Sequence, residues 1–584
     1  MLKIFLKFKP IHWVLTAVLI GITVGQVWFD VQMLPDYTEE LIRRMMEGYS
    51  SNYLWRTGGW MLLYAGGSLL ANLVGGIIAA YLAASLGKRI RKDLFAKVQS
   101  FGFEEMNKFS TASLITRSTN DITQVQTVAV MMLRMAINAP ITAIWAIVRI
   151  QSTSWQFTVT TAVAIGGVAV LLLIACIFVL PKFRLIQKLT DRLNAVARQN
   201  LTGLRVVKAY NADEYEQNKL HDVNYKLNQT NIFANSVMAV MLPILNLVMQ
   251  GVNLVIWWLG AHLIQDGTIA FPQLQFFSSL IMQVLLAFLM IAMLLVMVPR
   301  AQVSAKRIHE VLRTNAKITD KAEPLVFAED CCGTIEFDNV TFKYPDAENS
   351  VLENISFEVK KGQTAAFIGS TGSGKSTLIN LIPRFYDVSE GGVKVGGLDV
   401  RDVAQKDLRK RIGYVPQKGV LFSGTIEENI GYCESAEKEK AENPDALKQA
   451  AHVACAEEFI EDLDEKYEAK VSQGGKNFSG GQKQRMSIAR AVAAKPEIFI
   501  FDDSFSALDY KTDKEVRARL KQFTGESTCL IVAQRIGTIM DADVIVVLEK
   551  GKMVGKGTHK ELLESCEIYK EIALSQLSEE ELVS

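Results

Sequence analysis

The chain has 584 residues, roughly three to four times the length of a typical domain, so a single compact core is excluded. It is 49% hydrophobic and only 21% charged, with a mean hydropathy of +0.17, which is too apolar for an ordinary soluble enzyme or a disordered scaffold. The 63 Lys and Arg residues balance 62 Asp and Glu residues, so a net charge of +1 offers no global field for nucleic acid. Seven Cys residues without a CxxC pair fit neither a secreted disulfide framework nor a zinc site, and they predict reduced cytosolic thiols.

Long apolar runs occupy the first 300 residues and predict six membrane spans, because each is about 18 residues or longer. An even number of spans places both termini on one side of the membrane. The first run has no small-residue cleavage site after it, so we expect a retained span and not a signal peptide. The predicted spans are His12–Phe29, Leu62–Leu86, Thr127–Ile150, Phe157–Leu180, Ile232–Leu259 and Phe276–Val298.

The charges of the connecting segments predict the orientation. Basic residues gather before span one, between spans two and three, and between spans four and five, which places these segments in the cytosol. The loop from Asp30 to Arg56 is mixed in charge but holds Asp36, Glu39, Glu40 and Glu47, and the loop His262–Gln275 has no Lys or Arg, so both are predicted to be external. The cytosolic connections keep a helical period, so we expect the membrane helices to continue past the bilayer. The prediction is a multi-pass protein of the cell membrane with both termini in the cytosol.

Polar and sulfur-containing residues interrupt the spans. Those of span five share one helix face, which indicates either interhelical hydrogen bonds or the wall of a transport cavity. The Met residues of span six are read as core filler, and Arg134 and Arg149 of span three as structural residues. The polar face consists of Asn235, Asn246, Gln250 and Asn253.

A glycine-rich run in the second half has the context of a phosphate-binding loop. It follows the apolar strand Thr364–Ile368 and precedes the apolar helix Leu378–Ile382, so its backbone N–H groups and the helix N-terminus would face an anion. Lys375 is predicted to contact the β- and γ-phosphates, and the Ser376 hydroxyl is predicted to bind Mg²⁺. The run is Gly369, Ser370, Thr371, Gly372, Ser373, Gly374, Lys375, Ser376 and Thr377.

A second apolar strand, Ile498–Phe501, ends in Asp502 and Asp503, and Asp502 is predicted to hold Mg²⁺ beside the phosphate loop. Between the two elements lies the run Ser479, Gly480, Gly481 and Gln482. With this run the chain resembles the ATP-binding cassette transporters, whose signature loop is a Ser-Gly-Gly-Gln sequence that opens a helix. The resemblance covers essentially the whole chain.

The resemblance implies the remaining contacts and the architecture. Tyr344 is similar to the aromatic residue that stacks on adenine, and Gln417 to the loop glutamine near Mg²⁺. ATP would lie between the phosphate loop of one cassette and the signature loop of another, so two chains would be needed. The implied fold is an all-α domain of six transmembrane helices with long cytosolic extensions at 1–314, a linker at 315–332, and an α/β P-loop nucleotide-binding domain at 333–584.

Two positions depart from the family pattern. Asp503 stands where the family has the Glu that orients water, and it is shorter by one methylene, about 1.5 Å. Gln534 stands where the family has a His, and an amide cannot carry a proton at pH 7. The chain therefore resembles the degenerate-site subunit of bacterial heterodimeric multidrug-type exporters. We predict that it binds ATP with weak hydrolysis while its signature loop completes the site of a homologous partner.

Alternative functions stay open at this point. The same residues are compatible with a homodimeric exporter or lipid flippase that hydrolyses ATP slowly and symmetrically, or with an ATP-gated membrane protein that does not pump. Flux against a gradient would separate a pump from a pore. We expect an amphipathic small-molecule cargo, although the spans do not distinguish drugs, lipids and short peptides.

Overall fold

The computed structural model describes residues 10–48, 51–151, 155–328, 333–345 and 347–577. The Lys residues before span one and residues 329–332 of the predicted linker lie outside these ranges. The chain divides into two compact units, Met1–Gln99 with Thr111–Thr314, and Ser100–Ser110 with Asn315–Ser584.

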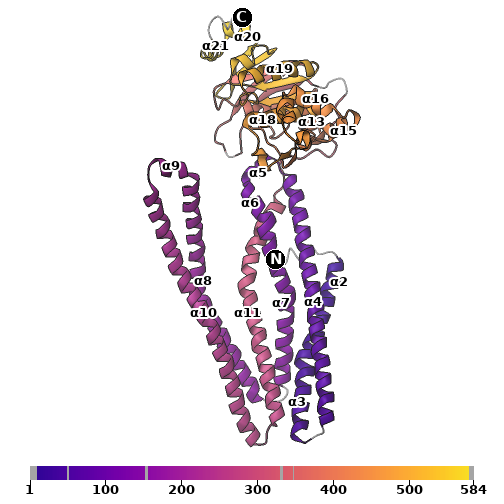
Figure 1. The fold of residues 1–584 in the computed structure, drawn as a ribbon, viewed down its shortest axis with the longest axis vertical. Coiled ribbons are helices and arrows are strands. Elements are labelled where there is room, and N and C mark those ends of the chain that lie inside the picture. Colours follow the sequence, from indigo (N-terminus) through magenta and orange to yellow (C-terminus); the bar gives the residue numbers. More distant parts are fainter. Residues whose placement is uncertain (1–9, 49–50, 152–154, 329–332, 346, 578–584) are drawn as a thin grey trace. The chain divides into compact units, whose positions relative to one another are not determined.

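The first unit consists of long helices (Figure 1). Within the described residues, five helical segments are long and apolar enough to cross a membrane, and α8 carries a shorter apolar segment, Trp155–Leu171. Each of the six predicted spans therefore lies on its own long helical segment. The elements are α2 (Pro10–Val27), the π-helix η1 (Trp28–Met33), α3 (Leu34–Met46), α4 (Ser51–Gln99), α6 (Thr111–Thr116), the π-helix η2 (Arg117–Asp121), α7 (Ile122–Gln151), α8 (Trp155–Thr202), α9 (Leu204–Ala209), α10 (Asp213–Gln265) and α11 (Phe271–Arg313).

The helices extend well past their apolar runs, as the helical period of the connections predicted. The 49 residues of α4 span roughly 74 Å at 1.5 Å per residue, more than twice the thickness of a hydrocarbon core. The prediction of a loop from Asp30 to Arg56 is wrong for most of its length. Asp30 lies in η1 and helix α3 follows directly, because Val31 is fully buried and Pro35 is compatible with the first turn of a helix.

Aromatic and aliphatic side chains fill the core between α7, α8, α10 and α11. The rings of Phe157 on α8 and Phe277 on α11 stack with centroids 4.4 Å apart, and both are fully buried. Arg149 is structural, as expected, since it pairs with Asp36 and its guanidinium lies 5.1 Å from the ring centroid of Phe276.

One residue of the polar face on α10 makes an interhelical contact. Asn253 accepts a hydrogen bond of 2.8 Å from the Ser278 hydroxyl on α11. Asn235, Asn246 and Gln250 are exposed on this chain. The hydrogen-bonding interpretation therefore holds for Asn253.

The second unit contains a six-stranded sheet in the order β12-β11-β3-β10-β9-β6 and a four-stranded antiparallel sheet in the order β2-β1-β4-β5. In the larger sheet β11, β3, β10, β9 and β6 run parallel, and β12 is antiparallel. The strands are β1 (Ile335–Phe342), β2 (Leu352–Val359), β3 (Thr364–Gly369), β4 (Glu390–Val395), β5 (Leu398–Asp399), β6 (Ile412–Val415), β7 (Gly424–Thr425), β8 (Lys470–Val471), β9 (Ile498–Asp502), β10 (Thr528–Val532), β11 (Val544–Glu549) and β12 (Lys552–Gly557).

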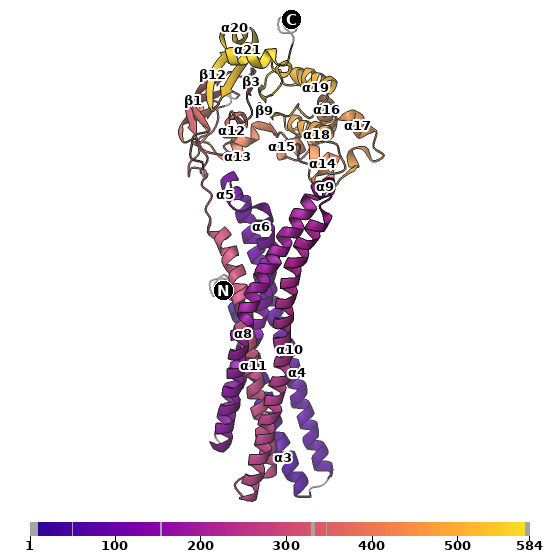
Figure 2. The same cartoon turned by 90° about the vertical axis from the view of Figure 1, so that its left-hand side faces the viewer.

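Helices cover these sheets (Figure 2). Every residue of β9 is buried, as expected for a parallel strand with a neighbour on each side. The helices are α5 (Phe103–Lys108), α12 (Lys375–Leu381), α13 (Gln405–Lys410), α14 (Ile426–Ile430), α15 (Glu434–Glu442), α16 (Ala446–Val453), α17 (Glu457–Glu461), α18 (Gly480–Ala493), α19 (Tyr510–Phe523), α20 (His559–Ser565) and α21 (Glu567–Leu574), with the short 3₁₀ turns η4 (Lys466–Glu468), η5 (Gln473–Gly475) and η6 (Ile536–Thr538).

Helix α5 belongs to this second unit although its sequence lies between two membrane spans. The Phe103 ring lies 4.6 Å from the Phe385 ring, centroid to centroid. The Glu105 carboxylate is 5% exposed and accepts hydrogen bonds from the backbone N–H groups of Gly102 (2.9 Å) and Lys317 (3.0 Å). Helix α5 is therefore held within the second unit by a ring contact and a buried carboxylate.

The stacked pair in the membrane unit yields a stability prediction. Phe277→Ala removes a ring from a filled core and is expected to cost about 3 to 5 kcal/mol. Phe271→Ala is the matched control, since Phe271 lies on the same helix and is 41% exposed. Thermal unfolding of the purified chain, followed by Trp fluorescence, should show a much larger drop in Tm for Phe277→Ala, and equal drops would contradict the packing.

Candidate nucleotide-binding site

The phosphate loop connects the end of β3 to the start of α12, and two of its glycines occupy crowded positions. Gly369 has φ +155°, and a Cβ there would lie 2.0 Å from the carbonyl oxygen of Leu548. Gly374 has φ +99°, and a Cβ would lie 2.7 Å from Leu352 Cδ2. A side chain at either position is excluded, so glycine at 369 and 374 lets the loop pass closely over the neighbouring strands.

Lys375 opens α12 and folds back over this loop. Its Nζ donates hydrogen bonds of 2.8 Å each to the carbonyl oxygens of Gly369 and Ser370. Burial lowers the pKa of Lys375, while the nearby carboxylates of Asp503 and Asp502 act in the opposite direction. The ammonium group therefore lies where the loop and the acidic residues converge.

Asp502, the last residue of β9, receives hydroxyl groups from two elements. The Ser376 hydroxyl on α12 donates to Oδ1 at 2.8 Å, and the Tyr414 hydroxyl on β6 lies 3.4 Å from Oδ2 and 3.1 Å from Asn380 Oδ1. Burial raises the pKa of the Asp502 carboxyl, and burial also raises the pKa of Tyr414, so the phenol stays protonated as a donor. Tyr414 had no role in the sequence prediction, although it precedes Gln417 in the same Tyr-Val-Pro-Gln run.

Asp503 brings the altered positions together. Its Oδ2 accepts hydrogen bonds from the side-chain amides of Gln534 (2.8 Å) and Gln417 (3.1 Å). The residue is 7% exposed and has φ +48°, and its N–H donates to the carbonyl of Val532 at the end of β10. Gln417, Asp503 and Gln534, which come from separate segments of the sequence, thus meet at one carboxylate oxygen.

Tyr344 lies beside the phosphate loop. Its hydroxyl is 3.1 Å from the Thr377 hydroxyl, and its ring is edge-on to Phe342 and Tyr386, with centroid distances of 4.9 and 5.3 Å. The neighbouring rings fix the orientation of an aromatic face next to the loop.

These groups fit Mg²⁺ and a nucleotide triphosphate by their chemistry. The Ser376 hydroxyl, the Asp502 carboxylate and the Gln417 amide are oxygen ligands of the kind Mg²⁺ prefers, and the first two are already in contact. The Lys375 ammonium lies against the loop carbonyls and supplies a positive charge for the phosphates.

The signature run presents the start of a separate helix. Ser479 caps α18, since its Oγ accepts from the N–H of Gln482 at 3.3 Å and its own N–H donates to Gln482 Oε1 at 2.9 Å. Ser479 and Gly480 are exposed, and Gly481 and Gln482 are half-buried. The N-terminus of a 14-residue helix is thus on the surface. Gln484, which sequence reasoning missed, is 1% exposed and donates to the carbonyl of Pro416, tying α18 to the Gln417 loop.

Comparisons with known proteins agree with this geometry. A family model described as ABC transporter transmembrane region matches residues 14–289, and one described as ABC transporter matches residues 352–506. The chain is 37% identical over 545 residues to an uncharacterised ABC transporter ATP-binding protein of Mycobacterium tuberculosis, with 93% of each chain covered. It is 30% identical over 517 residues to the ATP-dependent lipid A-core flippase of Pseudomonas syringae, covering 86% of this chain and 82% of that one. A solved bacterial Atm1-family ABC exporter with ATP bound has the same fold, with a TM-score of 0.80, 22% identity, and 97% and 98% of the two chains covered.

The raised pKa of Asp502 predicts a pH dependence of nucleotide binding. Mg²⁺ requires the ionised carboxylate, so the contribution of Asp502 should decline with falling pH before the ordinary aspartate value of about 4 is reached. Binding of a fluorescent ATP analogue with and without Mg²⁺ measures this contribution as the difference between the unmodified chain and Asp502→Asn. A difference that stays constant from pH 8 to pH 4.5 would contradict the prediction.

Proposed function

We propose that this chain, which belongs to the ABC transporter family, forms one half of a heterodimeric exporter of amphipathic small molecules. Its own phosphate loop holds ATP with weak hydrolysis, and its signature loop completes the hydrolytic site of a homologous partner chain.

Membership of the family supports the general part of this proposal, namely membrane location, ATP binding and dimer formation. The chain is a multi-pass membrane protein with a cytosolic nucleotide-binding domain, it binds ATP, and transporters of this kind work as dimers in the bilayer. Within the proposal, residues 1–314 are the transmembrane domain, 315–332 the linker and 333–584 the nucleotide-binding domain.

The observation that carries the proposal is the arrangement around Asp503. A carboxylate that activates water needs a free oxygen aimed at the water molecule. Both amide donors hold Oδ2 of Asp503, which leaves Oδ1 to face water, but the missing methylene withdraws this oxygen from the position that a glutamate would reach. The Gln534 amide donates an N–H but does not titrate near pH 7, whereas the imidazole at this place in the family pattern can take up and release a proton. The water-activating pair is therefore replaced by a fixed hydrogen-bonded cluster.

The residues that grip the nucleotide are complete, in contrast to this cluster. When bound, ATP would receive the loop N–H groups, the Lys375 ammonium and the Tyr344 ring, and Mg²⁺ held by Ser376, Gln417 and Asp502 would neutralise phosphate charge. The exposed start of α18 offers Ser479 and backbone N–H groups to phosphates bound by another chain. A site that binds ATP with a full set of contacts but activates water poorly is suited to holding the nucleotide. An intact signature loop is suited to completing a hydrolytic site on the partner chain.

A second candidate function is a homodimeric lipid flippase with two slow, equal sites. The similarity to a relative whose printed name is a lipid A-core flippase favours it. Under that alternative, the isolated chain would hydrolyse ATP at the rate of the native complex and no dissimilar partner would co-purify. Flux of cargo against a gradient in vesicles separates either pump from an ATP-gated protein that does not pump.

Restoring the family residues tests the chemistry of the site. The purified chain in nanodiscs should have little ATPase activity, and Asp503→Glu with Gln534→His should raise it by up to about a hundredfold, since a displacement of this size costs on that order. Adding Lys375→Ala to the double variant should abolish the gain. Hydrolysis that stays flat after both changes would refute the geometric explanation.

In the native complex, the signature loop of this chain should matter more for ATP hydrolysis than its phosphate loop. Gly480→Ala alters the signature loop at a position where a Cβ meets nothing within 4 Å, so the variant should fold normally. In the heterodimer, this change should lower ATPase activity far more than Lys375→Ala in the same chain. Equal losses from the two variants would favour two equivalent sites.

A further inference from the structure

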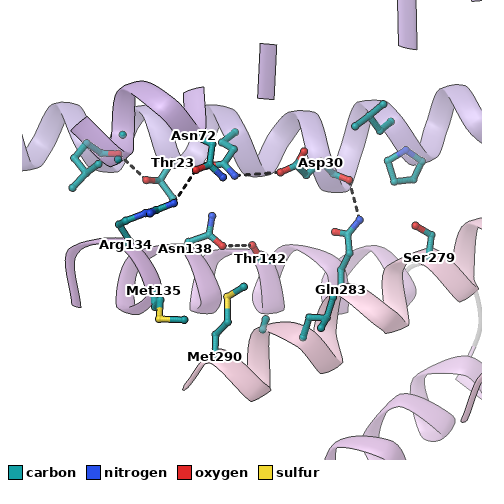
Figure 3. A pocket seen from close by; sticks show the side chains of 18 of the residues that line it. Thr23, Asp30, Asn72, Arg134, Met135, Asn138, Thr142, Ser279, Gln283 and Met290 are labelled. Carbon is teal, nitrogen blue, oxygen red and sulfur yellow. Dashed lines mark hydrogen bonds between the residues drawn. The ribbon is translucent and has the colours of Figure 1, made fainter. Parts of the chain in front are cut away.

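A cavity of about 1010 Å³ lies inside the membrane unit, among α2, η1, α3, α4, α7 and α11 (Figure 3). It belongs to one chain and is separate from the nucleotide site. Its wall combines apolar side chains, including Leu19, Met131, Met135 and Met290, with two charged residues, Arg134 and Asp30. Sequence reasoning treated Arg134 as structural and placed Asp30 in an external loop, whereas both line the cavity.

The two opposite charges do not pair with each other. The Arg134 guanidinium donates to the amide oxygen of Asn72 at 2.9 Å, and Asp30 Oδ1 accepts from the Ser68 hydroxyl at 2.6 Å. Ser68 and Asn72 lie four residues apart on α4, which is about 6 Å along the helix axis. Within the described residues, neither charge has an ion-pair partner. Charges at membrane depth usually pair, so two separated charges held by neutral groups indicate a ligand that supplies the counter-charges.

A π-helical irregularity of the backbone at Asp30 brings the Gln283 side chain, with a further hydrogen-bond acceptor, next to this residue. The Leu34 N–H donates to the carbonyl of Phe29 in π-helical fashion, and Pro35 has no N–H, so the Asp30 carbonyl lacks its usual helical donors. The Gln283 amide nitrogen on α11 donates to this carbonyl instead, at 3.0 Å. Gln283 Oε1 is buried and has no hydrogen-bond partner among the described residues.

The cavity is therefore divided by charge. One end offers the Arg134 guanidinium, with the Asn138 amide also on the wall, to an anionic group. The other end offers the Asp30 carboxylate and the vacant acceptor Gln283 Oε1 to an ammonium group. The rest of the wall is made of neutral polar and apolar side chains, and its Met side chains adapt to varied apolar shapes.

We propose that this cavity binds a zwitterionic amphiphile, with its carboxylate or phosphate at Arg134, its amine at Asp30 and Gln283, and its apolar body against the Met and Leu side chains. The inference rests on the proposed function only in treating the cavity as part of the transport route. It names the substrate class that the site selects.

Three matched probes test the proposal, since they share one acyl chain and differ by one charge each. N-lauroyl-lysine carries both charges, N-lauroyl-norleucine only the carboxylate, and N-lauroyl-lysinamide only the ammonium. Equilibrium binding of each probe is measured on the native complex in nanodiscs, with empty nanodiscs subtracted. We expect the zwitterion to bind at least tenfold more tightly than either single-charge probe, and three equal affinities would overturn the proposal without affecting the ATPase predictions.

Two variants assign the charges. Arg134→Gln should remove the preference for the zwitterion over the cationic probe, and Asp30→Asn should remove its preference over the anionic probe. Arg43→Gln is the matched control, because Arg43 pairs with Glu40 and does not line the cavity. An unchanged ranking in both folded variants would overturn the assignment, and the ranking by the unmodified complex remains decisive where a variant does not fold.

Nanodisc composition separates two sources of such a ligand. If zwitterionic lipid headgroups occupy the cavity, discs containing half phosphatidylethanolamine should weaken N-lauroyl-lysine binding severalfold relative to phosphatidylglycerol discs. If the ligand is a soluble peptide-like compound, the affinity should be the same in both. Either result is consistent with the zwitterionic site and identifies its source.

Discussion

The parallel pairing of β3, β10 and β9 is the constraint on which the nucleotide site depends. Val532 at the end of β10 is paired with Phe367 on one side and with Asp502 on the other. Parallel strands present their carboxyl ends at one edge, so the phosphate loop, the two Asp residues and Gln534 come together although about 165 residues separate the first from the last. No single contact within the site could do this without that register.

Much of this arrangement could be predicted from the sequence, because its signals are local. The apolar runs marked the helices, and the glycine loop and the Asp pair each follow a short apolar strand. Tyr414 and Gln484 escaped prediction because their roles depend on neighbouring strands and on a distant carbonyl, which no local spacing reveals. Helix α5 escaped for the same reason, since its partner Phe385 lies in the other half of the sequence.

The membrane unit shows where reasoning by hydropathy stops. Asp30 was assigned to a loop because a charge ended the apolar run, yet the helix continues through it as a π-turn. Hydropathy measures the cost of a charge in lipid. It does not take account of polar side chains inside a helix bundle that stabilise the charge. Ser68 and Gln26 provide such an interior for Asp30, as Asn72 does for Arg134. On the polar face of α10, the structure supports the hydrogen-bonding interpretation for Asn253, and the cavity-wall interpretation of the other residues stays a prediction.

The hydrogen bonds around Asp503 also explain why the two altered positions belong together. A glutamate at 503 would carry its carboxylate one methylene further and into the space of the Gln534 amide, which now lies 2.8 Å from the aspartate oxygen. Aspartate with glutamine forms one self-consistent cluster, and the family's glutamate with histidine would form another. Because residues in direct contact couple energetically, Asp503 and Gln534 are best understood as a single unit whose members determine each other's geometry.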